Sequence, residues 1–334
     1  MKGSIPTIHN DLGEINIGPG SSFSEIPEQI RERSHKEGFV FNLLVVGRRG
    51  LGCSTLVNSL FSANLVPKDR SERINTTINE IIEGEIKLTI SVTTYHGEDF
   101  DNVIQYVEDL NQEYFENEQG LNIPFLDRRI HCCLYLTPSD KMTSKEISGV
   151  QELSNKVNLI PIITKADMFT VEELKQHRDK VNSIFCESEV KFYDYGEKDK
   201  EQFPMAIIAS ETIFEDNGFR IRGRKYPWGV IDIENKKFSD FKKLQRILIG
   251  ERFIDLIYET DKVFYSASRK MLMKKESSTA SKQRLTKIIS QLENIVEEKY
   301  KNVITELKAQ YSKVLAMKTS EMSLECSTSA IVNE

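Results

Sequence analysis

The amino-acid sequence predicts an α/β fold in which helices cover both faces of a doubly wound, mostly parallel β-sheet. Apolar runs of strand length alternate with helical patterns from residue 39 to about residue 270, and turn residues separate them. A glycine-rich turn joins the first strand to the first helix. With 334 residues, 39% of them hydrophobic, the chain is long enough for one large domain with extensions or for two small domains.

Five apolar runs are the predicted strands, and four segments between them show helical spacing. The strands are 42–47, 86–92, 130–136, 157–163 and 205–210. The helices are 55–61, 101–114, 143–156 and 170–185. Continuous apolar runs are typical of strands that are buried on both faces, so we expect helices on both sides of the sheet.

The composition argues against several classes of protein. The net charge of −6 disfavours binding to bulk nucleic acid. The five cysteines are scattered without a C-x-x-C pair, which indicates reduced intracellular thiols and neither a disulfide framework nor a zinc site. The longest apolar runs reach about a third of a membrane span, and the N-terminus lacks the pattern of a secretory signal. We therefore expect a protein of the cytosol or nucleus.

The first 37 residues contain few large apolar side chains and predict a flexible arm. Near its end lies a short basic stretch of Arg31, Arg33 and Lys36, interspersed with glutamates. This stretch either makes a weak contact with an anionic membrane or is a solvated helix face.

The C-terminal part is predicted to be helical over residues 251–318, with an interruption near 276–281, because no Gly or Pro follows Gly250. One narrow apolar seam repeats every eleven residues, which favours a straight or slightly right-handed coil. Such a seam predicts a partner helix, and the alternative is a helix folded back onto the domain. The seam residues are Leu285, Ile289, Leu292, Val296, Tyr300, Val303, Leu307, Tyr311 and Val314. Residues 319–334 are predicted to be a disordered tail.

The glycine-rich turn, 41-FNLLVVGRRGLGCSTLVNSLF-61, has the design of a phosphate-binding loop. Glycines allow successive backbone N–H groups to surround phosphates, and the helix that follows directs its positive end at them. Gly47, Gly50 and Gly52 keep this backbone, and Ser54 and Thr55 keep the hydroxyls.

Cys53 stands where a phosphate-binding loop carries the lysine that neutralises the β- and γ-phosphates. Arg48 and Arg49 lie inside the loop and offer charge from a different direction. Taken alone, the turn also fits the alternative of an ordinary strand–turn–helix junction.

A second motif, 161-PIITKADMFT-170, follows a predicted buried strand and suits guanine recognition. Asp167 is the candidate that accepts hydrogen bonds from guanine N1–H and its exocyclic amine, and the stem of Lys165 is expected to pack on the base. Adenine does not supply that pair of donors, so such a carboxylate discriminates between the two bases.

At 220-RIRGRKYPWGVIDIENKKFSDFKKLQRILI-249 the sequence resembles the septin family. Further similar stretches are 38-GFVFNLLVVGRRGLG-52, 127-DRRIHCCLYLTP-138 and 157-VNLIPIITKADMFTVEEL-174, so that the resemblance covers about residues 28–270. It implies a P-loop NTPase-like (Ras-like) fold, GTP or GDP as ligand, and co-assembly with other septins into rods and filaments. It also implies that Trp228, within the R-G-R-x-Y-P-W-G block, lies at the interface across the nucleotide.

The resemblance assigns nucleotide-binding roles by position. Phosphate contacts fall on the loop, with Ser54 as a weak candidate for Mg²⁺, and base contacts fall on the later motifs. The expected binding residues are Gly47, Arg49, Gly50, Leu51, Gly52, Cys53, Ser54, Thr55, Lys165, Asp167, Ala209 and Arg224. Ala209 stands where septins usually have Gly, and its methyl group is expected to crowd the purine.

Several positions depart from the septin pattern. Thr93, Thr94, Tyr95 and His96 replace the D-T-P-G of the second switch, and Arg70 and Ser71 fall where septins place the Thr that positions the attacking water. His96 is expected to be a surface or interface residue and not a catalytic base. Without the Lys, the switch Asp and the Thr, we expect no catalytic residues and no hydrolysis, and Mg²⁺ is doubtful.

These observations predict a cytoskeletal septin subunit at the cell cortex, division site or prospore membrane, serving division or sporulation. The alternative function is a slow GTPase in which Arg48 or Arg49 replaces the lysine. A solitary nucleotide-binding module is disfavoured by the apolar seam. The predicted organisation is an arm (1–37), a G domain (38–273) that includes the septin unique element (about 218–273), a coiled-coil helix (274–318) and a tail (319–334).

Overall fold

A computed structural model describes the chain in separate ranges: 7–8, 15–16, 32, 38–67, 73–84, 86–120, 125–194, 203–216, 219–275, 288–305 and 308. The predicted basic stretch, the switch positions Arg70 and Ser71 and the C-terminal tail lie outside the described residues. The chain divides into two units, one of Met1–Glu116 with Pro124–Arg269 and one of Asn117–Ile123 with Lys270–Glu334.

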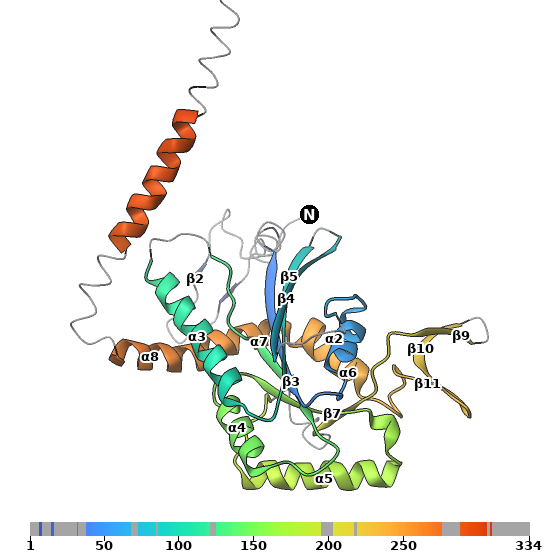
Figure 1. Ribbon diagram of the computed structural model, residues 1–334. Coiled ribbons are helices and arrows are strands. Elements are labelled where there is room, and N and C mark those ends of the chain that lie inside the picture. The colour runs from blue at the N-terminus through green and yellow to red at the C-terminus, as the bar shows by residue number, and fades with distance from the viewer. Residues whose placement is uncertain are drawn as a thin grey trace, which may run out of the picture. The chain divides into compact units, whose positions relative to one another are not determined.

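The centre of the first unit is a six-stranded sheet with the order β4-β5-β3-β6-β7-β8 (Figure 1). Neighbouring strands run parallel except β4, which pairs antiparallel with β5 from Ile74↔Tyr95 to Glu83↔Ile86. The strands are β3 (Phe39–Gly47), β4 (Ile74–Glu83), β5 (Ile86–His96), β6 (Cys132–Thr137), β7 (Leu159–Thr164) and β8 (Met205–Ile207). The predicted mostly parallel sheet is confirmed.

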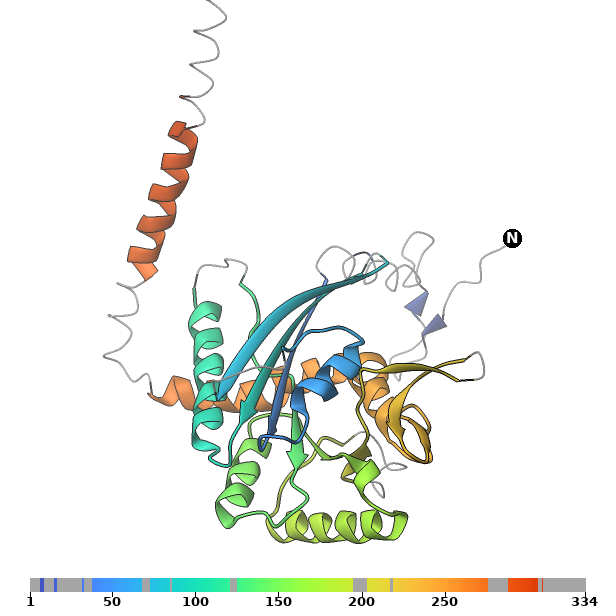
Figure 2. The ribbon, with the colours of Figure 1, turned by 45° about the vertical axis from the view of Figure 1, so that its right-hand side comes forward.

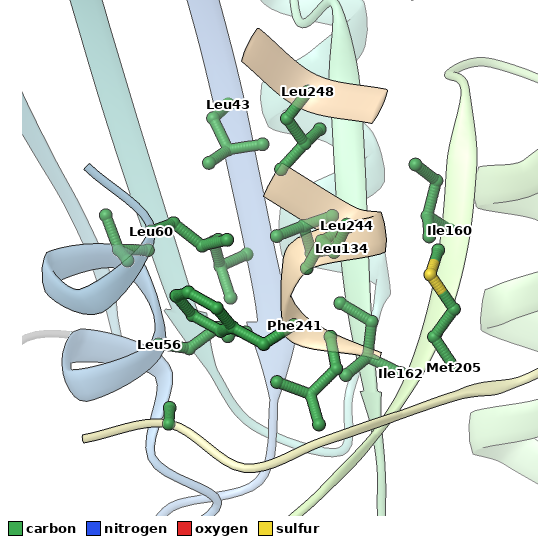
Figure 3. Close-up of a cluster of buried hydrophobic side chains, with 14 of the residues drawn as sticks. Leu43, Leu56, Leu60, Leu134, Ile160, Ile162, Met205, Phe241, Leu244 and Leu248 are labelled. Atoms are coloured by element: carbon green, nitrogen blue, oxygen red, sulfur yellow. The ribbon is translucent and has the colours of Figure 1, made fainter. Parts of the chain in front are cut away.

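Two hydrophobic clusters cover the two faces of this sheet, because successive strand residues point to opposite sides. Leu43 and Val45 of β3 belong to one cluster, and Leu44 and Val46 belong to the other. Helix α2 (Cys53–Phe61) packs on the first side together with α6 (Phe241–Gln245), as Figure 3 shows for Leu56, Leu60, Phe241 and Leu244. Helices α3 (Asp101–Glu118), α4 (Ser144–Ser154) and α5 (Val171–Glu187) contribute the second cluster.

A second, antiparallel sheet has the order β11-β10-β9 and lies outside the main one (Figure 1). Its strands are β9 (Ile213–Asp216), β10 (Phe219–Tyr226) and β11 (Gly229–Asp232). Two further short strands, β1 (Thr7–Ile8) and β2 (Ile15–Asn16), pair with each other. The block at 220–249, which resembles septins, contains β11 and most of β10, but these strands are not among those that the sequence predicts.

The C-terminal region is helical, as predicted, over the described residues 253–275, with local π-helical segments, and the expected interruption at 276–281 lies outside the described residues. After α6 it runs through a π-helical segment (Arg246–Glu251), α7 (Phe253–Glu259), a second π-helical segment (Thr260–Tyr265) and α8 (Ser266–Lys275). Residues 288–305 are helical again. Within the described ranges, none of the helices combines the length and the hydropathy that a bilayer-spanning segment requires.

Strand β4 is not among the strands that the sequence predicts. Its side chains are mostly half-exposed, and Ile78, Glu80 and Ile82 are exposed. The apolar signal of an edge strand with one open face is therefore weak, and pairing along the whole of β5 decides its conformation (Figure 2).

Candidate functional site

The loop between β3 and α2 has the backbone of a phosphate-binding site. Gly50 and Gly52 have φ values of 87° and 90°, in the left-handed region that favours glycine. Gly52 is the N-cap of α2 and makes no side-chain cap hydrogen bond, so the first turn of the helix presents its N–H groups. Gly47 is needed for a different reason, since a Cβ there would lie 2.9 Å from the Cβ of Leu136.

Two adjoining cavities follow this loop and share Gly50, Gly52 and Thr55. The base-side cavity measures about 240 Å³, and the phosphate-side cavity about 350 Å³. The base-side cavity is lined by Gly50, Leu51, Gly52, Thr55, Leu56, Thr164, Lys165, Ile207, Ala209 and Arg224. The phosphate-side cavity is lined by Arg49, Gly50, Gly52, Cys53, Ser54, Thr55 and His96. The lining of the two cavities therefore extends from the end of β7 to the start of α2.

Cys53 supplies no cation to the phosphate-side cavity. Its side chain is 3% exposed and belongs to the hydrophobic cluster beneath α2. Burial raises the pKa of the Cys53 thiol to about 12, so it is protonated and neutral near pH 7. Its Sγ atom lies 3.8 Å from Nδ1 of His96.

Arg48 is directed at carboxylates and does not line either of the two cavities. Its Nη2 donates to Oε2 of Glu146 at 2.7 Å, its Nη1 contacts Asp140 at 3.0 Å and its Nε lies 3.3 Å from Glu98. The hydrogen bond to Glu146, with the nearby carboxylates, raises the pKa of Arg48 despite its partial burial. This geometry argues against Arg48 as a substitute for the missing lysine and leaves Arg49, which lines the phosphate-side cavity.

The second-switch positions offer poor ligands for Mg²⁺. Thr93, where septins have Asp, is buried, and its hydroxyl lies 2.9 Å from that of Thr76 and 3.4 Å from that of Tyr106. The Ser54 hydroxyl donates to the carbonyl of Pro67 at 3.5 Å. A neutral hydroxyl in place of the carboxylate removes the hard anionic ligand that Mg²⁺ prefers, so this donor set does not fit the metal.

On the base side, the side chain of Asp167 is fully buried, and Asp167 is not among the residues that line the cavity. Nη1 of Arg224 donates to both carboxylate oxygens, at 3.2 Å and 2.9 Å, and the hydroxyl of Tyr226 donates to Oδ2. Arg224 also donates through Nε to the carbonyl of Ala209 at 3.1 Å. Asp167 and Arg224, which are both predicted to contact the base, are therefore close together. In this structure, however, the carboxylate of Asp167 accepts hydrogen bonds from Arg224 and Tyr226.

The structure brings most of the predicted site residues together. Leu51, Lys165, Ala209 and Arg224 line the base side, and Arg49, Cys53 and Ser54 line the phosphate side. Gly47 packs on β6, and Asp167 is covered. The predicted site residues do not include Tyr226 or the cavity-lining Thr164 and Leu56. Tyr226 was detectable in principle, because it follows Arg224 by two positions on a strand and so shares its face.

A strand–glycine loop–helix junction that opens onto these cavities is the architecture of the P-loop class of proteins. A sequence profile described as Septin matches residues 37–282. The chain is 44% identical over 319 residues to cell division control protein 10 of Encephalitozoon cuniculi (strain GB-M1), covering 91% of this chain and 90% of that protein. It is 34% identical over 303 residues to Septin-5 of Rattus norvegicus, covering 80% of each chain. The chain belongs to the septin family.

The fold is also found among solved structures. The crystal structure of the septin GTPase domain from Chlamydomonas reinhardtii aligns with a TM-score of 0.56 and 22% sequence identity, covering 70% of this chain and 99% of that chain. The family resemblance and the P-loop NTPase-like fold that the sequence predicts are both confirmed.

Proposed function

We propose that this chain is a structural septin subunit that binds guanine nucleotide in the two adjoining cavities without hydrolysing it. In this proposal it co-assembles with other septins into hetero-oligomeric filaments or rings. One observation carries the proposal: the glycine backbone of the phosphate loop is intact while the side chain at its lysine position, Cys53, is buried and neutral.

The proposed absence of hydrolysis follows from charge. Phosphoryl transfer requires an in-line water and cations that neutralise the developing charge on the phosphates. In this chain, Cys53 stands in place of the phosphate-binding lysine, and Thr93 stands in place of the carboxylate that binds the metal. Each lost charge-assisted contact costs about 1.5–3 kcal/mol, or roughly one to two decades of affinity. The nucleotide is therefore expected to bind weakly, unless a neighbouring subunit covers it and slows its release.

Two groups of exposed apolar side chains, one on the β10–β11 turn and one on the C-terminal helix, support assembly with other subunits. Trp228, the only tryptophan, is 71% exposed on the turn between β10 and β11. The described seam residues from Ile289 to Val303 are exposed on a charged helix. We accordingly propose the domain organisation given above, with the G domain at 38–273 and a coiled coil at 274–318. Filaments would place the protein in the cytoskeleton at the cell cortex or division site; a sporulation role and a weak membrane contact stay predictions.

Two measurements on the purified full chain test this function. The first is co-purification with candidate septins, followed by identification of the nucleotide released on denaturation; release of guanine nucleotide is expected. The second is a single-turnover assay with radiolabelled GTP, in which no phosphate release above the uncatalysed rate is expected. Failure to join any septin complex, together with brisk turnover, contradicts the proposal.

A matched pair of variants tests the role of Cys53. Cys53→Lys places an ammonium group in the phosphate-side cavity, which has about 350 Å³ to receive it. We expect GDP affinity to rise by about ten- to a hundredfold, the reciprocal of the loss estimated above. Cys186→Lys adds the same charge at an exposed cysteine of α5 and is expected to leave the affinity unchanged. Equal affinities for the two variants would show that charge at this position is not limiting.

A slow GTPase is the second candidate function, and the position of Arg49 favours it. Arg49 lines the phosphate-side cavity and also a neighbouring cavity of about 450 Å³ beside the second switch. In this alternative, phosphate release is measurable in the single-turnover assay and is lost in Arg49→Met.

A further inference from the structure

Asp167, the proposed guanine-reading residue, already has donors on its buried carboxylate. Arg224 donates to both oxygens, and Tyr226 donates to Oδ2. None of the Asp167 side chain is exposed, and Asp167 is not among the residues that line the base-side cavity. A buried carboxylate without donors is costly, so these contacts stabilise the ligand-free arrangement.

Both donors come from strand β10, which pairs with β11 through Arg224↔Ile231 and Tyr226↔Gly229. Desolvation and the contact with Asp167 raise the pKa of Tyr226, so its hydroxyl carries the proton that it donates. The ring of Tyr226 stacks on Trp228, with centroids 5.0 Å apart and planes 4° from parallel. The contact with Asp167 therefore links the base site to the exposed β10–β11 turn.

From this geometry we infer that Tyr226 is a specificity-determining residue that competes with guanine for Asp167. The inference rests on the proposed function, because it concerns the same nucleotide site. Guanine binding replaces the Tyr226 hydroxyl, and with it part of the Arg224 contact, by the N1–H and amino donors of the base. Adenine has no such pair of donors for a carboxylate and leaves Tyr226 in place. The competition therefore lowers the affinity for guanine nucleotides selectively.

The test compares GDP and ADP binding by calorimetry to the full chain and to Tyr226→Phe. The variant removes one hydrogen-bond donor from the ligand-free state only, so GDP is expected to bind about tenfold more tightly while ADP affinity is unchanged. Tyr258→Phe, at an exposed tyrosine of α7, is the matched control and is expected to leave both affinities unchanged. A merely structural Tyr226 would instead move both affinities together or neither, and that result overturns the inference.

A double-mutant cycle adds a second readout. In an Asp167→Asn background the competition is weakened because the acceptor has lost its charge, so Tyr226→Phe is expected to alter the GDP-to-ADP ratio much less than in the natural chain. An undiminished effect in that background would show that Tyr226 acts elsewhere.

A nucleotide-free measurement separates failure of this inference from failure of the proposed function. Hydrogen exchange over 219–232 is expected to be faster in Asp167→Asn and Tyr226→Phe than in Tyr258→Phe, because the contact that holds β10 is lost. Unchanged exchange overturns the inference whether or not nucleotide binds. Faster exchange in a chain that binds no GDP supports the contact while contradicting the proposed nucleotide site. GDP binding with an unchanged GDP-to-ADP ratio in Tyr226→Phe leaves the proposed function standing and removes the inference.

Discussion

Glu146 is a carboxylate with 2% of its side chain exposed, and it lies beside the phosphate loop. Arg48 pairs with it at 2.7 Å, and the hydroxyl of Tyr135 donates to it at 3.2 Å. Glu146 also closes the capping box at the start of α4, with Thr143 as N-cap. Arg48 thus connects the loop between β3 and α2 to the first turn of α4. We infer that this contact holds the loop in place.

Substitutions of the adjacent Arg48 and Arg49 are expected to affect different properties, namely stability for Arg48 and GDP affinity for Arg49. Arg48→Met leaves Glu146 as a buried charge without its cation, and we expect the free energy of unfolding to fall by about 3–5 kcal/mol. Arg49→Met removes charge from an exposed loop position that lines the phosphate-side cavity. It is expected to weaken GDP binding about tenfold, the loss of one charge-assisted contact, with little change in stability.

Urea denaturation followed by circular dichroism gives the stability of both variants, and calorimetry gives their GDP affinities. Each arginine serves as the control for the other, since they are adjacent and carry the same charge. A stability loss in Arg49→Met with none in Arg48→Met would reverse the assignment of the two side chains.

Helix α2 is held at its C-terminal end by residues far along the chain. Its start faces the two cavities, while its last carbonyls, which have no partner within the helix, accept hydrogen bonds from side chains of β10 and α6. Arg222 of β10 donates to the carbonyl of Ser59 at 2.8 Å and to the hydroxyl of Ser62 at 2.9 Å. Gln245 of α6 donates to the carbonyl of Leu60 at 2.9 Å. The Arg222 contacts connect α2 to β10, the strand that also carries Arg224 and Tyr226.

Loss of the Arg222 contacts should therefore destabilise the end of α2. Arg222→Gln removes charge-assisted hydrogen bonds to a helix terminus and is expected to cost about 1.5–3 kcal/mol, lowering the melting temperature of the full chain. Arg220→Gln, on the same strand, removes only an exposed contact with Glu215 at 3.6 Å and is expected to cost under about 0.5 kcal/mol. Equal melting temperatures for the two variants would mean that these contacts do not support α2.

The elements that the sequence predicts best are those whose pattern is local. The apolar run of β3 and the Thr143 and Thr170 capping boxes of α4 and α5 are readable from neighbouring residues. Strand β4 and the strands β9–β11 are not, because partly exposed residues such as Ile78 and Glu80 carry little periodic signal. Their conformation depends on pairing with strands that the sequence alone does not assign to them.

The candidate site shows the same division. The positions of Gly50 and Gly52 in the loop are predictable from the glycine pattern, and their positive φ values agree with it. Lys165 and Arg224 are identified by short sequence motifs. The partners of Arg48 and Asp167 are not predictable in this way. Asp140 and Glu146 lie more than ninety positions after Arg48, and Tyr226 lies 59 positions after Asp167. Only the folded topology decides which charges meet.

Across the whole chain, the apolar side chains that remain exposed point to association. In the first unit, Trp228 is exposed on the turn between β10 and β11, and Val230 is exposed on β11. In the second unit, Ile289, Leu292, Val296, Tyr300 and Val303 are between 38% and 68% exposed on the helix over 288–305. The seam spacing of eleven residues per three steps predicts that these side chains return to one face of a nearly straight helix. An apolar stripe on an otherwise charged helix is stabilised by packing against another helix.

Charges placed on this seam should prevent coiled-coil association. Leu292→Glu with Val303→Glu inserts two carboxylates, eleven residues apart, into the apolar stripe, and burying them unpaired against a partner helix is strongly unfavourable. The control, Asn294→Glu with Thr305→Glu, adds the same two charges at the same separation on the opposite side of the helix, beside the charged residues Glu298 and Lys301. We expect the seam variant to lose co-sedimentation with partner septins by at least tenfold and the control to keep it. GDP affinity of the isolated chain should be the same for both, because the nucleotide cavities lie wholly within the first unit. Equal loss of association in the two variants would indicate a general charge effect and would contradict a seam-mediated coiled coil.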